Sequence, residues 1–213
     1  MMNVKNELKK NKVKNFSPPT IDSLELSQVQ ESINDKYYLK FLDEMNGGYF
    51  FNGSLHFYGV CADLPFHSIM NVNSHLRSCY KDLSQGIFSF GEDLFGNQFC
   101  FSKDGVILFN LESAEKEKIA TNFEGFLAAI FDNSEDLDYY TGQSLMQEWQ
   151  SLGHSLQYGE RLCPKQPFII GGEFEVENLH VKSFDKNLEY NSKIAYQISN
   201  LPDGTEIKIT IES

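Results

Sequence analysis

Apolar residues recur at helical spacing in the first third of the chain. Four of them stand at positions i, i+3, i+4 and i+7, which places them on one face of a helix: Tyr38, Phe41, Leu42 and Met45. The pair Gly47-Gly48 follows, and glycine readily adopts the left-handed conformation that ends a helix. The pattern therefore predicts an amphipathic helix that stops at this glycine pair.

Alternating apolar residues between positions 49 and 110 predict strands. The dipeptide Asn52-Gly53 lies between two short apolar runs, and both of its residues tolerate the positive φ of a tight hairpin turn. The expected elements are strands at Tyr49–Phe51 and Leu55–Tyr58, a helix at Asn71–Lys81, and strands at Ile87–Phe90, Gln98–Ser102 and Val106–Asn110. Together they predict an antiparallel meander interrupted by one helix.

The clearest helix start is Thr121-Asn122-Phe123-Glu124, where a threonine cap and a glutamate three residues later can satisfy each other's amide groups. Apolar residues then line one face at helical spacing: Phe123, Phe126, Leu127, Ile130 and Phe131. We expect this helix to cover the sheet. The polar break Asp132-Asn133-Ser134 after it is the best candidate domain boundary.

The last third of the chain predicts further α and β elements. They are a helix from Leu137 to Leu152 that ends at Gly153, a loop containing Pro164 and Pro167, an extended Phe174–Val181, a helix at Phe184–Ile198 and a strand at Glu206–Glu212. We therefore divide the chain into residues 1–16, a basic tail; 17–132, the main domain; and 133–213, an α+β extension. The extension either completes the same sheet layer or forms a lobe of its own.

Charge narrows the classes of partner. The 213 residues carry a net charge of −12, yet residues 1–15 hold five lysines and one glutamate, so the remainder stands at −16 once this local +4 is set aside. Such a field repels nucleic-acid phosphates and anionic membranes and attracts a basic protein. Acidity that only keeps the protein in solution is the competing interpretation.

The start of the chain lacks the apolar core and cleavage site of a secretory signal. The longest apolar stretch beside a helix, Phe126–Phe131, is far shorter than the roughly 20 residues of a membrane span. We therefore expect a cytoplasmic protein.

Motifs that would carry chemistry are missing from the sequence. The four cysteines and five histidines are scattered without metal-ligand spacing: Cys61, Cys79, Cys100, Cys163, His56, His67, His75, His154 and His180. There is no nucleophile elbow and no phosphate-binding glycine loop. We expect no catalytic residue, no cofactor and no metal. An enzyme of unfamiliar type would need a deep pocket with convergent polar groups.

Residues 17–132 resemble a SUKH domain, of the Smi/Knr-like superfamily. The resemblance rests on the order of four segments: Tyr38–Leu42 running into Asn46-Gly47-Gly48, Leu55–Gly59, Phe90–Asn97 leading into Gln98-Phe99, and Ile119–Leu127. It implies an α+β fold, with a mostly antiparallel sheet covered by helices. In bacteria it implies an immunity protein that binds a toxin, many such toxins being basic nucleases or other nucleic-acid-modifying enzymes.

Within this domain, Glu92, Asp93 and Phe95 are the expected partner-contact residues. An aromatic side chain beside carboxylates suits an interface anchor with its charged surround. The alternative places the two acids in a solvated turn and folds Phe95 into the core. The resemblance also allows a second function, a cytoplasmic scaffold or regulatory adaptor without a toxin partner, for which the basic N-terminal arm is the feature to inspect.

Overall fold

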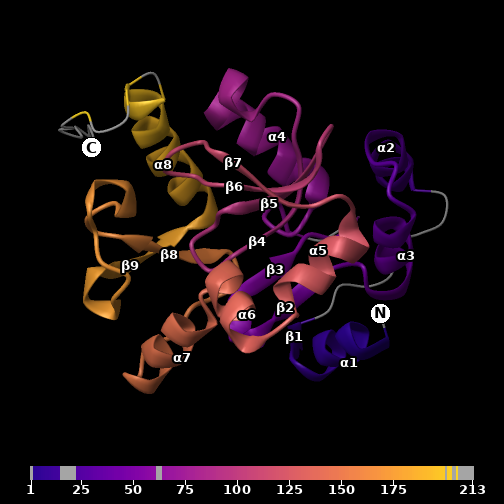
Figure 1. The fold of residues 1–213 in the computed structure, drawn as a ribbon, viewed down its shortest axis with the longest axis horizontal. Coiled ribbons are helices and arrows are strands. Elements are labelled where there is room, and N and C mark those ends of the chain that lie inside the picture. The colour runs from indigo at the N-terminus through magenta and orange to yellow at the C-terminus, as the bar shows by residue number, and fades with distance from the viewer. Residues whose placement is uncertain (1, 15–22, 61–63, 200, 203–204, 206–213) are drawn as a thin grey trace.

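The structure is a computed structural model that describes residues 2–14, 23–60, 64–199, 201–202 and 205. Seven strands form one antiparallel sheet in chain order (Figure 1). They are β1 (Lys12–Lys14), β2 (Gly48–Phe50), β3 (Leu55–Phe57), β4 (Phe88–Glu92), β5 (Gln98–Ser102), β6 (Gly105–Phe109) and β7 (Lys116–Ala120). With its helices the molecule is an α+β protein, as the sequence predicted.

Helices precede, interrupt and follow this sheet. They are α1 (Met2–Lys10), α2 (Leu24–Ser32), α3 (Lys36–Met45), α4 (Ile69–Tyr80), α5 (Phe123–Ile130), α6 (Ser134–Thr141), α7 (Gln143–Ser151) and α8 (Phe184–Ile198). A separate antiparallel pair, β8 (Glu160–Pro164) and β9 (Leu179–Ser183), lies beside α8.

One face of the sheet is buried under α3 and α5. The ring of Phe90 lies 5.4 Å from Tyr38 of α3 and 5.2 Å from Phe126 of α5, measured between centroids. Phe57 and Phe99 of the neighbouring strands also contact these helices. Edge-to-face packing of large rings combines burial with favourable quadrupole geometry, so this aromatic layer is the main apolar core.

The opposite face carries polar side chains and is covered by α4 and the C-terminal elements. Ser89 precedes Phe90 and therefore points the other way. Its backbone N–H donates to Asn73 Oδ1 and its carbonyl accepts from Asn73 Nδ2, both at 2.7 Å, which fixes α4 on the sheet. Helix α8 packs on α4, and the hydroxyl of Tyr196 donates to the carbonyl of Tyr80 at 2.7 Å.

Residues 2–14 of the segment expected as a basic tail are folded onto the sheet. Lys12 of β1 pairs with Phe50 of β2, so the segment adds an edge strand. Leu8 of α1 has no exposed surface and belongs to the main core. The lysine-rich composition indicated a tail, but the burial of Leu8 and the hydrogen bonds between β1 and β2 stabilise a folded segment.

Several predicted elements are confirmed. The helix of Tyr38 and Met45 buries its four apolar residues, and Phe184–Ile198 is helical over its full predicted length. The hairpin turn at Asn52 and Gly53 is present, with φ of 58° and 98°.

Other predictions are wrong in detail. The cap of α5 is Asn122, whose Oδ1 accepts from the N–H of Gly125 at 2.8 Å, rather than Thr121. The single helix predicted from Leu137 is two helices, because Gly142 adopts a left-handed φ of 70° between them. The strand predicted at Glu206–Glu212 lies outside the described residues.

The junction of α3 and β2 has almost no room for a side chain at Gly47, and this gives a stability prediction. Gly47 has φ of +79°, and a Cβ there would overlap the carbonyl oxygen of Phe57. Gly153 has a similar φ of +84° with no atom near its missing Cβ. Gly153→Ala should therefore cost only the left-handed strain of about 1–2 kcal/mol, and Gly47→Ala clearly more. Urea denaturation of both variants measures this, and equal losses would contradict the packing described.

Candidate functional site

The loop that follows β4 is closed by its own hydrogen bonds. Asp93 Oδ1 accepts from the N–H of Phe95 at 2.9 Å and from that of Asn97 at 2.8 Å, while Asn97 Nδ2 donates to Asp93 Oδ2 at 2.8 Å. Asn97 Oδ1 accepts in turn from the N–H of Leu111 at 2.9 Å. These bonds make residues 93–97 a fixed turn (the 93–97 loop).

The three predicted contact residues differ in exposure. Glu92 has no exposed surface and Asp93 is 7% exposed, whereas Phe95 is half-buried. Glu92 therefore offers a partner no surface in this conformation. Phe95 is the most exposed of the three, and the partner-binding role of the set stays a prediction.

Glu92 instead belongs to a buried polar network. Its Oε1 lies 2.7 Å from Nδ1 of His56 on β3, and Nη2 of Arg161 on β8 donates to the same oxygen. Arg161 Nη1 also donates to the carbonyl of Glu160, and the ring of Tyr49 stacks on His56 with centroids 3.9 Å apart.

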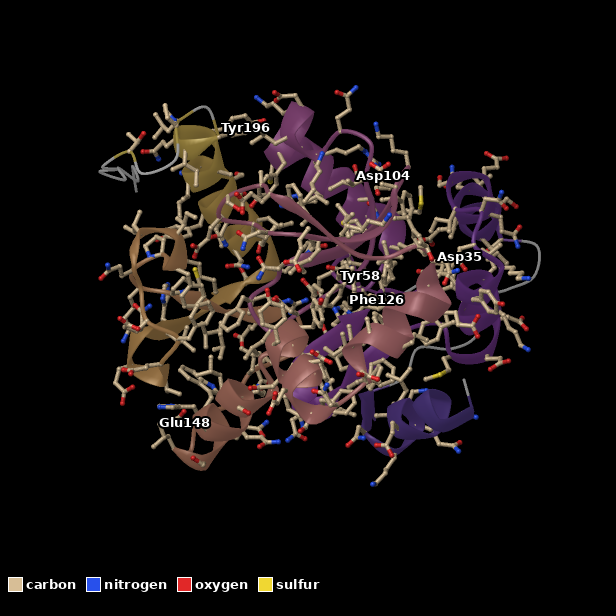
Figure 2. All side chains as sticks on the ribbon, in the orientation of Figure 1. Asp35, Tyr58, Asp104, Phe126, Glu148 and Tyr196 are labelled. Carbon is tan, nitrogen blue, oxygen red and sulfur yellow. The ribbon has the colours of Figure 1, made fainter. Side chains whose placement is uncertain are left out.

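The network continues along the sheet through Gln98. Its Nε2 donates to Glu92 Oε2 at 3.3 Å, and its Oε1 accepts from the hydroxyls of Tyr58 at 2.9 Å and Ser89 at 2.7 Å. Figure 2 shows Tyr58 near the centre of the molecule. The side chains of Glu92 and His56 are each 1% exposed, so these groups are sealed from any external molecule. Their role here is to join the sheet to β8.

A surface groove lies between the 93–97 loop and helices α6 and α7. It has a volume of about 540 Å³, and its lining includes Phe95, Asp138, Tyr139, Glu148 and Phe174. We call it the acidic groove. Tyr139 is 70% exposed and Phe174 is 63% exposed, which are large values for aromatic side chains. The ring of Phe174 stacks on Phe168 at 4.0 Å and contacts Phe95.

The charged residues that line the groove are all acidic: Asp93, Asp138 and Glu148. Residues 119–160 contain no lysine or arginine and seven acidic residues: Glu124, Asp132, Glu135, Asp136, Asp138, Glu148 and Glu160. Glu148 stands at the edge of the molecule in Figure 2. Glu173 and Glu175, which flank Phe174, are exposed as well.

A metal site or a membrane-spanning helix would be visible among the described residues. No three His, Cys, Asp or Glu side chains in that part of the chain gather closely enough to hold a metal ion. Within the same ranges, every helix is too short or too polar to cross a membrane.

Comparison with protein families identifies the sheet domain. The model of the SMI1 / KNR4 family (SUKH-1) matches residues 21–129, just over half of the chain. The chain belongs to this family. Proteins of the SUKH-1 family are generally associated with immunity and are generally non-catalytic. A search of curated proteins found no match.

One solved structure shares the SUKH-1 fold of this chain over a longer range. The crystal structure of Atu4351 from Agrobacterium tumefaciens superposes with a TM-score of 0.55 and 16% sequence identity, covering 88% of this chain and 87% of the other. The shared fold therefore extends beyond residues 21–129.

Sequence reasoning missed the residues contributed from outside the SUKH-1 match. Arg161 was not singled out, although an arginine directly before Leu162 and Cys163 in an apolar strand indicates a buried partner. Phe174 was treated only as part of an extended segment. Its position between Glu173 and Glu175 was the available signal, since an aromatic side chain beside carboxylates suits an interface anchor with a charged surround.

The buried ion pair between the SUKH-1 sheet and β8 gives a second prediction. Arg161→Met leaves Glu92 buried without its cation, so the variant should lose about 3–5 kcal/mol of unfolding free energy. Adding Glu92→Gln removes the orphaned charge and should recover a large part of that loss. Chemical denaturation of the single and double variants tests this, and a double variant as unstable as the sum of the singles would contradict the pairing.

Asp93 gives a prediction about pH. Burial raises its pKa to about 7, and the hydrogen bonds from Asn97 and Phe95 limit the rise. Because the folded protein then holds this proton at pH values where the unfolded chain has lost it, the Asp93 contribution to stability falls as pH rises from about 4 to about 7. Asp93→Asn should therefore gain stability relative to the wild type across that interval. Denaturation midpoints measured at several pH values test the sign, and a constant difference would contradict it.

Proposed function

We propose that this protein is an immunity protein that binds a protein toxin and neutralises it by occupying it, with no chemical step. The match of residues 21–129 to a family generally associated with immunity carries the proposal. The cytoplasmic location and the absence of a cofactor expected from the sequence remain predictions.

The proposed toxin is a basic protein, such as a nuclease or another nucleic-acid-modifying enzyme. Support comes from the net charge of −12. It also comes from residues 119–160, which contain acidic residues but no lysine or arginine. Opposite charge accelerates encounter and disfavours partners of the wrong sign. An enzyme that binds phosphates carries a positive surface around its active site, and an acidic protein can cover that surface.

The adaptor hypothesis lacks a specific observation in its favour. The feature to inspect for this hypothesis was the N-terminal segment, as a free basic arm. Leu8 is instead buried in the core, and Lys12 is paired with Phe50 at the sheet edge.

Co-expression with the product of a neighbouring toxin-like open reading frame tests the proposal. The toxin should stop killing when this protein is present, and the two should form a stable complex. The association rate should fall about tenfold or more between about 0.05 M and 0.5 M salt, because attraction between exposed charges is screened within about 10 Å at 0.1 M. Undiminished killing without a complex contradicts the function, and a salt-independent rate contradicts its electrostatic part.

A further inference from the structure

We propose that the acidic groove binds a cationic segment of the partner protein, with an apolar side chain of that segment seated among Phe95, Tyr139 and Phe174. The inference rests on the proposed function, in which the partner is the toxin. It adds the surface that makes the contact and the chemistry of the segment that fits it.

The groove has the composition of a contact surface. Phe95, Tyr139 and Phe174 bring three aromatic rings to one hollow of about 540 Å³. Tyr139 and Phe174 leave most of their surface in water, although aromatic side chains gain free energy on burial. Aromatic residues are enriched among the residues that dominate binding energy at interfaces. An apolar side chain of a partner would bury both rings.

The rim selects the charge of the segment. Asp138 and Glu148 line the groove, and Glu173 and Glu175 flank Phe174. No lysine or arginine is among the residues that line the groove. Arginine and lysine side chains therefore match this rim, whereas nucleic-acid phosphates or an acidic second copy of this chain would be repelled.

The 93–97 loop and helices α6 and α7, which form the walls of the groove, are fixed by contacts within the protein. The N–H of Leu94 donates to the carbonyl of Thr141 at 3.3 Å, and Asn187 Nδ2 donates to the carbonyl of Phe95 at 2.7 Å. At the joint of α6 and α7, a Cβ on Gly142 would lie 3.2 Å from both Leu94 and Phe95, so helix and loop are in close contact. A groove with fixed walls loses little conformational entropy on binding.

A short synthetic peptide of arginine, phenylalanine and glycine serves as the probe, with a matched peptide in which glutamate replaces arginine. Titration calorimetry with the full chain should show binding of the first peptide only. Phe174→Ala should weaken it about tenfold or more, as expected for an aromatic anchor. Glu148→Lys should weaken it about threefold or more, and the loss should shrink at high salt.

The controls are Leu24→Ala and Glu31→Lys on α2, which lies on the other side of the molecule in Figure 1. Leu24 is 76% exposed and Glu31 is exposed. Leu24→Ala therefore matches Phe174→Ala as the truncation of an exposed apolar side chain, and Glu31→Lys matches Glu148→Lys in its change of charge. Both controls should leave peptide affinity within about twofold of the wild type, since they remove no groove contact. Equal losses in groove and control variants would mean unspecific attraction and would overturn the proposal, as would failure of the wild type to bind the peptide.

The same four variants with the toxin separate this inference from the proposed function. Loss of protection by Phe174→Ala and Glu148→Lys alone supports both. Full protection and unchanged affinity for the toxin in these two variants overturn the groove as the docking surface and leave the immunity function intact. A wild type that binds the peptide through the groove but never protects against a toxin overturns the immunity function and leaves the groove as a site for cationic segments.

Discussion

A buried charge must be neutralised by its neighbours, and this constraint fixes how the sheet and the C-terminal elements fit together. Glu92 has no exposed surface, and a lone carboxylate at that depth would be strongly destabilising. His56 on the adjacent strand and Arg161 on β8 meet the same oxygen of Glu92. Arg161 is buried as well, so both charges are compensated only when β8 lies against the sheet. The sheet face opposite the aromatic layer is thereby closed by the extension.

Much of the fold follows from local patterns, and the errors share one cause. The helix of α3, the hairpin at Asn52-Gly53 and the helix Phe184–Ile198 are visible because their apolar periodicity or turn chemistry lies within a few residues. Strand β7 was missed because Lys116-Glu117-Lys118 is charged, as suits the edge of a sheet, where lysines discourage pairing with other chains. Strand β8 was missed because its pairing partner, β9, follows only after a long irregular segment.

The candidate site was predictable only in part, for a related reason. Adjacent carboxylates in a loop normally indicate a solvated turn, and here Glu92 is buried because a partner from 69 residues later reaches it. Asp93 is buried because it accepts the loop's own amide hydrogens. No local pattern reports either fact. The sequence did place an aromatic at the right loop, since Phe95 lines the acidic groove, but the groove exists only once α6 and α7 are positioned beside it.

If the acidic groove is the docking surface, as we propose, stability and recognition depend on different residues. The aromatic layer, Asn73 and the Glu92 network are buried, so substitutions there change the folding free energy first. Tyr139, Glu148 and Phe174 are exposed, and substitutions at such positions change stability by about 0.5 kcal/mol or less. The walls of the groove can therefore vary in charge and shape while the sheet that carries them stays intact. A protein that must match one partner and reject others gains from this division, because specificity can change without a loss of fold.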